Sequence, residues 1–169
     1  MKKQSSFSST NEFHSIKLVL SDFDGVMTDG RVIVSETGEE SVFCNRLDGI
    51  GVRILKNHGI ETVIISSESN NVVMKRSEKL NITSHGNVSE KKAFVLELIK
   101  TKNLAENEVL YIGDEINDYD IMNHLGLTAC PSDAHKKIKE ISKLKLNSKG
   151  GHGVIREIAD ILIPKNVWK

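Results

Sequence analysis

The chain has 169 residues with 23 basic and 23 acidic side chains, so its formal net charge is zero. A chain of this length suits one domain, which buries roughly 70% of its unfolded surface on folding. The balanced charge gives no electrostatic reason to expect a nucleic acid or a membrane surface as a partner. No apolar run approaches the ~20 residues that a membrane-spanning helix needs.

The N-terminus and the cysteines indicate a cytoplasmic protein. Residues 1–14 are polar and serine-rich and lack the continuous apolar core of a signal peptide. We therefore expect a disordered tail followed by a single domain over residues 15–169. Cys44 and Cys130 are too few for a disulfide framework and have no metal-type spacing, so we interpret both as buried thiols in a reducing compartment.

Short apolar strands alternate with amphipathic helices along the chain. Residues 16–21 form a continuous apolar run ended by Asp22, which is typical of a strand buried on both faces. Residues 32–34 and 41–43 flank a turn signal at Thr37-Gly38 and predict a β-hairpin. The later elements that we expect are, in chain order, a helix from about Asp48 to His58-Gly59, a strand over 62–65, a helix over 69–80, a short strand over 83–85, a helix over 90–101, a strand over 108–112, a helix over 119–124, a strand over 127–130 and a helix over 153–163.

This alternation predicts an α/β fold, with a Rossmann-like parallel sheet between two layers of helices and the hairpin as a flap. Ligands in such sheets bind at the carboxyl ends of the strands. The residues that directly follow each strand are therefore the candidates for function. A run of lysines follows the last predicted strand and is interpreted as a solvated face: Lys136, Lys137, Lys139, Lys143, Lys145 and Lys149.

Two carboxylates, Asp22 and Asp24, follow the first strand, with Gly25 directly after them. A carboxylate can attack phosphorus and form an aspartyl-phosphate. A second carboxyl group beside it can protonate the leaving oxygen if its pKa is raised. Gly25 allows a sharp turn where a side chain would block a substrate. The alternative for the pair taken alone is a helix cap or an ordinary loop.

Polar residues that suit a phosphate follow the next two strands. Ser66 and Ser67 come after the strand over 62–65, where a hydroxyl and backbone N–H groups can hold an anion. Lys91 stands at the start of the helix over 90–101, where the helix dipole disfavours a cation, so a phosphate is a plausible reason for it. Taken alone, the serines are also common helix caps, and the lysine can be a solvated side chain; Lys92 is the alternative phosphate lysine.

An acidic turn, Gly113-Asp114-Glu115-Ile116-Asn117-Asp118, follows the strand over 108–112. Hard oxygen ligands of this kind suit Mg²⁺, which prefers one or two carboxylates plus substrate phosphate and water. An ordinary acidic loop is the alternative. A phosphate can approach Asp22, Asp24 and Asp114 only if a divalent cation and a lysine neutralise them, so the whole set predicts a magnesium-dependent phosphatase.

These four motifs resemble those of the haloacid dehalogenase-like phosphohydrolases, and the resemblance extends over about residues 15–163. It implies that Asp22 is the nucleophile and a metal ligand, and that Asp24 is the general acid/base and binds Mg²⁺ through its carbonyl oxygen. Asp114 would be the remaining metal ligand. It also implies supporting roles: Ser66, Ser67 and Lys91 on the phosphoryl group, and Asp118 and Asn117 behind the metal ligands.

Further motifs are similar to one branch, the small capless phosphatases of 3-deoxy-2-ulosonic acid phosphates. These are Asp29-Gly30, Asp48-Gly49-Ile50-Gly51 and the segment from Gly150 to Glu157. Only 43 residues separate Asp22 from Ser66, which leaves no room for a cap domain. The resemblance implies a homotetramer in which the hairpins assemble and a neighbour's C-terminal segment covers the site.

The substrate expected from this branch is a sugar-acid phosphate. Glu68, where octulosonate (KDO) 8-phosphate phosphatases usually carry arginine, and Lys79 resemble the members that act on nine-carbon, sialic-acid-type sugar 9-phosphates. KDO 8-phosphate is the alternative substrate. The resemblance to the phosphatase-like domain of acylneuraminate cytidylyltransferases suggests an alternative function, that of a non-catalytic oligomerisation module. The residues expected to select the substrate are Glu68, Lys79, Asp48, His152 and Arg156.

Overall fold

The chain alternates strand and helix as the sequence predicts, in a computed structural model that describes residues 13, 15–69 and 71–163. The predicted tail over residues 1–14, Phe13 apart, lies outside the described residues. Six parallel strands form one sheet in the order β5-β4-β1-β6-β7-β8. Their bounds are β1 Leu18–Ser21, β4 Glu61–Ile65, β5 Thr83–His85, β6 Val109–Ile112, β7 Thr128–Cys130 and β8 Leu144–Lys145.

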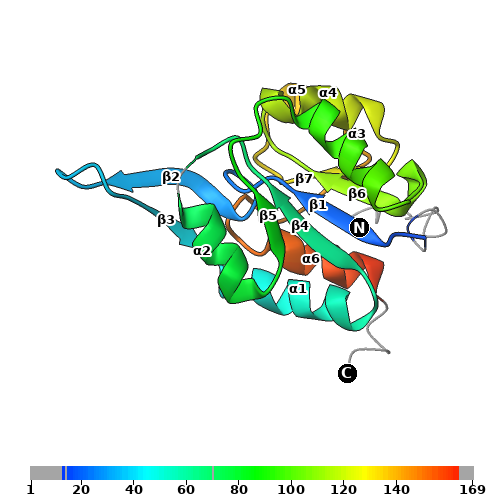
Figure 1. Cartoon of the computed structure of the whole chain (residues 1–169), viewed down its shortest axis with the longest axis horizontal. Helices are drawn as coiled ribbons and strands as arrows, with labels where there is room; N and C mark the ends of the chain where they lie inside the picture. The colour runs from blue at the N-terminus through cyan, green and yellow to red at the C-terminus, as the bar shows by residue number, and fades with distance from the viewer. Residues whose placement is uncertain (1–12, 14, 70, 164–169) are drawn as a thin grey trace, which may run out of the picture.

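Helices cover both faces of this sheet, so the fold has three layers (Figure 1). One layer holds α1 (Arg46–Asn57), α2 (Asn71–Leu80) and α6 (Val154–Leu162). The other holds α3 (Lys91–Thr101), α4 (Tyr119–His124) and α5 (Lys136–Ile141). Two 3₁₀ turns, Glu106–Glu108 and Ile116–Asp118, precede β6 and α4. The predicted Rossmann-like α/β class is therefore confirmed.

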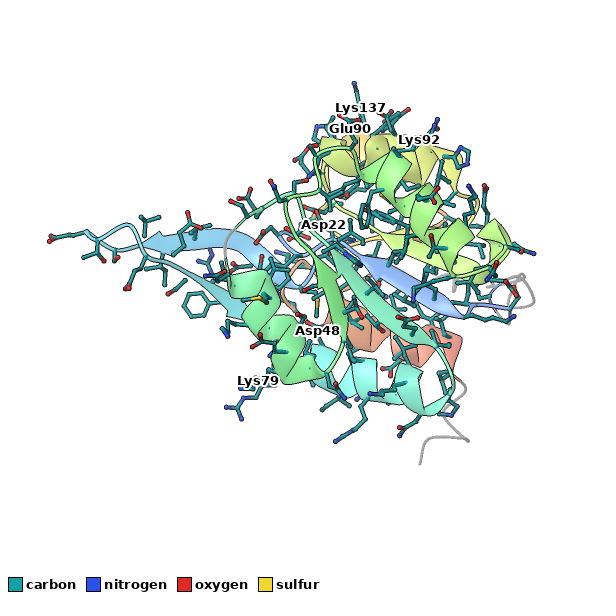
Figure 2. All side chains as sticks on the ribbon, in the orientation of Figure 1. Asp22, Asp48, Lys79, Glu90, Lys92 and Lys137 are labelled. Carbon is teal, nitrogen blue, oxygen red and sulfur yellow. The ribbon has the colours of Figure 1, made fainter. Side chains whose placement is uncertain are left out.

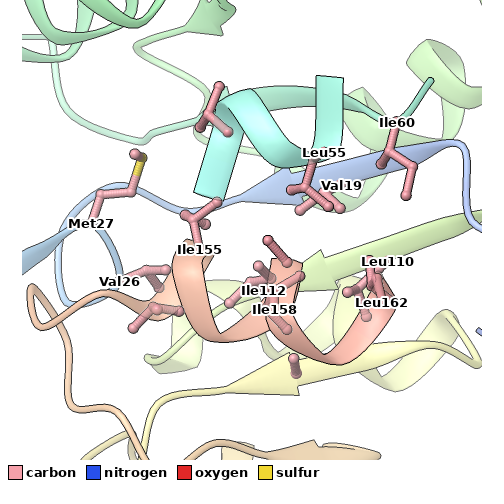
Figure 3. Close-up of a cluster of buried hydrophobic side chains, with 14 of the residues drawn as sticks. Val19, Val26, Met27, Leu55, Ile60, Leu110, Ile112, Ile155, Ile158 and Leu162 are labelled. Atoms are coloured by element: carbon pink, nitrogen blue, oxygen red, sulfur yellow. The ribbon is translucent and has the colours of Figure 1, made fainter. Parts of the chain in front are cut away.

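The core on the α1–α6 side is a continuous set of aliphatic side chains (Figure 3). Leu55 of α1 and Ile158 of α6 pack over Val19 of β1, and all three are fully buried. Burying one such side chain contributes about 1.5–3 kcal/mol. The two helices approach closely because Gly51 has no side chain: a methyl group there would lie 2.6 Å from the carbonyl oxygen of Ile155.

The predicted hairpin consists of β2 (Thr28–Val34) and β3 (Glu40–Cys44), which form a separate two-stranded sheet. It projects away from the six-stranded sheet (Figure 1). Its turn contains Gly38 with φ of +81°, a conformation that glycine adopts without strain. No cap domain separates β1 from β4 in the described chain, because the hairpin and α1 are the elements between them.

Some details differ from the prediction, chiefly at the starts of α1 and α2 and in the lysine-rich segment. Helix α1 begins at Arg46 because the Asn45 side chain accepts a hydrogen bond from the Leu47 N–H at 2.9 Å and caps the helix. Helix α2 is described from Asn71. The lysine-rich segment that we expected to be only a solvated face contains α5 and β8, with Ile138 and Leu144 buried. No helix in the described ranges is long and apolar enough to span a bilayer.

Candidate active site

The carboxyl ends of β1, β4 and β6 meet at one edge of the sheet, where a cleft of about 220 Å³ opens. It is lined by Asp22, Asp24, Gly25, Gly30, Ser66, Ser67, Glu68, Asp114, Glu115 and Asn117. The structure thus brings together the residues predicted after three different strands. A larger groove of about 670 Å³ lies between α1 and α2, but its lining has no carboxylate that could attack phosphorus.

Behind the cleft, Lys91 joins two carboxylates in the protein interior. Its Nζ lies 2.9 Å from Asp22 Oδ1 and 2.7 Å from Asp118 Oδ1, and its side chain is fully buried. The Phe23 N–H also donates to Asp22 Oδ1, at 2.7 Å, which fixes the orientation of that carboxylate. Lys92 is exposed on the outer side of α3, away from Asp22 (Figure 2). The geometry therefore favours Lys91 over Lys92 as the phosphate lysine.

Burial and neighbouring charge shift the pKa values of this ion pair. Burial and the Asp118 charge raise the pKa of Asp22 well above its ordinary value, and Lys91 only partly opposes them. Burial alone lowers the pKa of Lys91, but Asp22 and Asp118 outweigh it and the pKa is raised. The raised pKa favours the protonated form of Lys91, which lies buried behind Asp22.

Asp118 organises the acidic turn rather than facing the cleft. Its Oδ2 accepts hydrogen bonds from the backbone N–H groups of Asp114 at 3.1 Å and Glu115 at 3.4 Å. Its Oδ1 accepts from Lys91 and from the Tyr111 hydroxyl at 2.8 Å. We did not predict Tyr111, because in the sequence it is one more large residue in a buried strand. Its hydroxyl matters only once the turn places Asp118 beside it.

The carboxylates of Asp22, Asp114 and Asp118 each offer an oxygen within 4.8 Å of the others. Protein donors already occupy both oxygens of Asp118. In contrast, Asp114 Oδ1 is buried without a hydrogen-bond partner, which is costly unless a cation binds it. Burial, followed by the Asp118 charge, raises the pKa of Asp114 to about 7. Two hard carboxylates, one of them unsatisfied, fit Mg²⁺.

Gly25 lies between Asp24 and the acidic turn. It has φ of +75°, and a methyl group there would overlap the Asp114 carboxylate. Asp24 is half-buried, and its Oδ1 accepts a hydrogen bond from the Thr28 hydroxyl at 3.1 Å. Burial raises the pKa of Asp24. A carboxyl group that holds its proton more tightly is suited to protonating a leaving oxygen.

The two serines follow β4 and line the same cleft as the acidic turn. Ser66 is buried, and its hydroxyl accepts a hydrogen bond from the Glu68 N–H at 3.1 Å. The Ser67 hydroxyl donates to the Val88 carbonyl at 3.2 Å and lies 3.4 Å from the Asn117 side-chain nitrogen. Glu68 is exposed at the rim of the cleft.

Of the five residues expected to select the substrate, Glu68 lines the cleft and the other four do not, within the described chain. Lys79 lies in the groove between α1 and α2, far along α2 from the cleft (Figure 2). Asp48 is fully buried and accepts a hydrogen bond from the Ile155 N–H at 2.9 Å, which joins α1 to α6. Two are engaged locally: His152 Nδ1 lies 2.7 Å from the Gly150 carbonyl, and Arg156 Nε lies 2.7 Å from Asp160.

Comparisons with known proteins agree with this architecture. Residues 51–158 match the haloacid dehalogenase-like hydrolase family. A 3-deoxy-D-manno-octulosonate 8-phosphate phosphatase of Yersinia pestis is 33% identical over 150 residues, which are 88% of this chain and 80% of that protein. An N-acylneuraminate cytidylyltransferase of Oncorhynchus mykiss is 31% identical over 152 residues, but the match spans 88% of this chain and only 35% of that protein.

A solved structure supports the fold at the level of the backbone. The Moraxella catarrhalis 3-deoxy-D-manno-octulosonate 8-phosphate phosphatase, in complex with a magnesium ion, a phosphate ion and a KDO molecule, superimposes with a TM-score of 0.87. The sequences are 26% identical, and the match covers 90% of this chain and 88% of that one. With its parallel sheet, its acidic cleft and the match over residues 51–158, the chain belongs to the haloacid dehalogenase-like hydrolases.

Proposed function

We propose that this protein is a magnesium-dependent phosphatase that hydrolyses the phosphate ester of a 3-deoxy-2-ulosonic acid, with KDO 8-phosphate as the favoured substrate. One observation carries the proposal: Asp22, Asp24 and Asp114 line one small cleft, with Lys91 buried directly behind Asp22. Without cations, three carboxylates would repel a phosphate. The buried Lys91, together with Mg²⁺ bound by Asp22 and Asp114, would offset that negative charge and make the cleft suitable for a phosphate.

The residues divide the reaction into two displacements. A carboxylate oxygen of Asp22 forms a bond to phosphorus, and the bond from phosphorus to the sugar oxygen breaks, with Asp24 giving its proton to that oxygen. In the second step Asp24 takes a proton from water, the water oxygen bonds to phosphorus, and the Asp22–phosphorus bond breaks. Lys91 stays protonated through both steps and stabilises charge on the phosphoryl group. Mg²⁺ held by Asp22 and Asp114, together with the Asp24 carbonyl, would supply further neutralisation of the phosphoryl oxygens.

The nine-carbon preference predicted from Glu68 and Lys79 is not confirmed. Within one chain the two residues line different hollows, so they do not face one substrate. The Yersinia phosphatase, which matches most of this chain, acts on an octulosonate 8-phosphate, and the Moraxella structure holds a KDO molecule. The alternative that we stated from the sequence, KDO 8-phosphate, therefore fits better.

A phosphate-release assay tests the proposal directly. KDO 8-phosphate, KDN 9-phosphate and N-acylneuraminate 9-phosphate are compared with Mg²⁺ and with EDTA. We expect Mg²⁺-dependent turnover that is fastest with KDO 8-phosphate, and none in Asp22→Asn, whose amide cannot attack phosphorus. A faster reaction with either nine-carbon substrate would restore the original preference. Full activity of a correctly folded Asp22→Asn would remove Asp22 as the nucleophile.

A non-catalytic role is the second candidate, because the cytidylyltransferase match shows that a larger protein contains a similar segment. Such a module would have no chemical need for a buried Lys91 between Asp22 and Asp118. The same assay separates the two candidates. Absence of phosphate release from all three substrates, by a folded protein that binds Mg²⁺, would favour the non-catalytic role.

We also propose that the protein is a cytoplasmic homotetramer assembled through its hairpins. The side chains of Val32, Ile33, Val34 and Phe43 are 48%, 54%, 63% and 60% exposed, which is unusual for four large apolar residues on one hairpin. The free thiols Cys44 and Cys130 support a reducing compartment. Light scattering after gel filtration tests the assembly: we expect a tetramer mass that Ile33→Lys lowers, and a monomeric wild-type protein would refute it.

A further inference from the structure

A glycine-rich segment before α6, residues 147–153, lies directly against the catalytic loop, residues 22–29, which follows β1. A methyl group at Gly150 would overlap the carbonyl group of Gly25, and one at Gly151 would lie 2.6 Å from the Asp29 nitrogen. The Gly151 N–H donates a hydrogen bond to the Val26 carbonyl at 2.9 Å. The contact is therefore backbone against backbone, at a distance that only glycine permits.

Gly25, which contacts Gly150 on one side, contacts the acidic turn on its other side. Because a methyl group at Gly25 would overlap the Asp114 carboxylate, Gly25 is held between Asp114 and Gly150. The hydroxyl of Thr28 bonds to Asp24 Oδ1 and accepts from the Gly25 N–H at 3.3 Å. Any displacement of Gly150 would thus be passed to Gly25, and from there to the separation of Asp24 from Asp114.

Two carboxylates that the proposed mechanism does not use hold the glycine-rich segment in place. Glu157 Oε1 accepts from the Asn147 backbone and side-chain nitrogens at 2.9 and 3.0 Å, and Glu157 Oε2 accepts from the Ser148 N–H at 2.7 Å. Asp133 Oδ1 accepts from the Gly150 N–H at 2.9 Å. Burial alone raises the pKa of Glu157, but these hydrogen bonds outweigh it and lower the pKa, so Glu157 is a carboxylate at neutral pH.

We propose that Glu157 is a positioning residue for the catalytic loop. By fixing residues 147 and 148 at the start of the glycine-rich segment, it keeps Gly150 against Gly25 and so sets the placement of Asp24 relative to Asp114. Asp133 supports the same contact from the side of the acidic turn. This inference rests on the proposed phosphatase function, since it assigns a role in that reaction to a residue that touches neither substrate nor metal.

Glu157→Gln tests the inference, because it keeps the size of the side chain but puts an amide N–H₂ where one accepting oxygen was. Hydrogen exchange by mass spectrometry should become faster in peptides over residues 145–151 and also over 23–31, and remain unchanged in α3. In the phosphate-release assay we expect kcat to fall about tenfold with KM within twofold of the wild-type value, as for a displaced catalytic group. Glu140→Gln, an exposed carboxyl group on α5, is the matched control.

Ile158→Val shows what a loss of stability alone does to turnover, so it distinguishes a purely structural role of Glu157 from a positioning role. It loosens the buried face of α6 without removing the Glu157 hydrogen bonds. It should lower the melting temperature and leave kcat unchanged. If Glu157→Gln folds poorly, Asp133→Ala and Asp133→Asn give the same decision, because only asparagine keeps the acceptor for Gly150. We expect alanine to lower kcat and asparagine to restore it.

Any of three results would overturn the proposal: a wild-type kcat in Glu157→Gln, a wild-type kcat in Asp133→Ala, or faster exchange that stays confined to residues 145–151. The exchange measurement needs no substrate. If the wild-type protein releases no phosphate at all, the proposed function fails, while the exchange result still decides whether Glu157 controls the loop at 23–31.

Discussion

Replacement of Lys91 by methionine should be the most damaging single change at this site that leaves the packing volume intact. The Lys91 side chain is completely buried and bonds to Asp22 and Asp118 at 2.9 and 2.7 Å. Removal of one partner from a buried ion pair leaves uncompensated charge and costs about 3–5 kcal/mol. For a chain of this size, that loss lowers the melting temperature by roughly 6–20 °C.

The loss should also depend on pH in a defined direction. Lys91 lowers the pKa of Asp22, so its removal raises that pKa further above the unfolded value. A carboxyl group whose folded pKa is raised binds protons more tightly in the folded state, and its stability contribution is lost as pH rises. The deficit of Lys91→Met relative to the wild type should therefore be larger at pH 7 than at pH 5.

Urea denaturation followed by circular dichroism, in EDTA at pH 5 and pH 7, measures both effects. Lys92→Met is the matched control, since it makes the same change at the next, exposed position of α3 and should leave the midpoint unchanged. Phosphate release should fall at least about 100-fold in Lys91→Met, as for loss of one preorganised charged donor, and little in Lys92→Met. Equal stability of the two variants, or a deficit that shrinks at pH 7, would refute the reasoning.

Three further predictions concern the cleft and the helix contact behind it. Gly25→Ala should lower turnover about 100-fold and weaken Mg²⁺ binding in calorimetry, because the added methyl group displaces Asp114. Mg²⁺ at 100 times its dissociation constant should stabilise the wild-type protein by about 2.7 kcal/mol, and Asp114→Asn by much less, in thermal melts. Burial raises the pKa of Asp48 to about 6, so wild-type stability should fall by up to about 3 kcal/mol as pH rises from about 4 to 6. Asp48→Asn, which keeps the acceptor for Ile155, should lack that fall in urea titrations at the two pH values; an identical fall in both proteins would exclude Asp48 as its source.

Much of the fold was predictable because its strands are short, apolar and buried on both faces. The run ended by Asp22 has no other way to hide its side chains than a central strand. Strand β8 was missed for the opposite reason: it has two residues, and Leu144 is its one buried side chain among lysines. The start of α1 was placed too late because Asn45, which caps it, was not weighed.

Some residues of the candidate site could also be predicted from the sequence, and others could not. Residues directly after strands could be predicted, because parallel topology brings all carboxyl ends to one edge. Tyr111 and Glu157 could not, because neither lines the cleft and each is linked to it only through hydrogen-bonded neighbours: Asp118 for Tyr111, and Asn147 and Ser148 for Glu157. Lys79 was grouped with Glu68 as a substrate-selecting residue by resemblance alone. Glu68 precedes α2 and lies at the cleft rim, whereas Lys79 lines the groove between α1 and α2.

The electrostatics of the cleft explain why its parts belong together. Burial raises the pKa values of Asp22 and Asp114, so the protein alone holds these carboxylates at a cost in stability. One fixed cation, Lys91, compensates Asp22 and Asp118 and leaves Asp114 Oδ1 without a partner. A divalent cation relieves that cost and, by removing negative charge, also lowers the barrier to an approaching phosphate. Coupling between two binding events is reciprocal. If Mg²⁺ raises the affinity for phosphate by a given factor, a bound phosphate must raise the affinity for Mg²⁺ by the same factor.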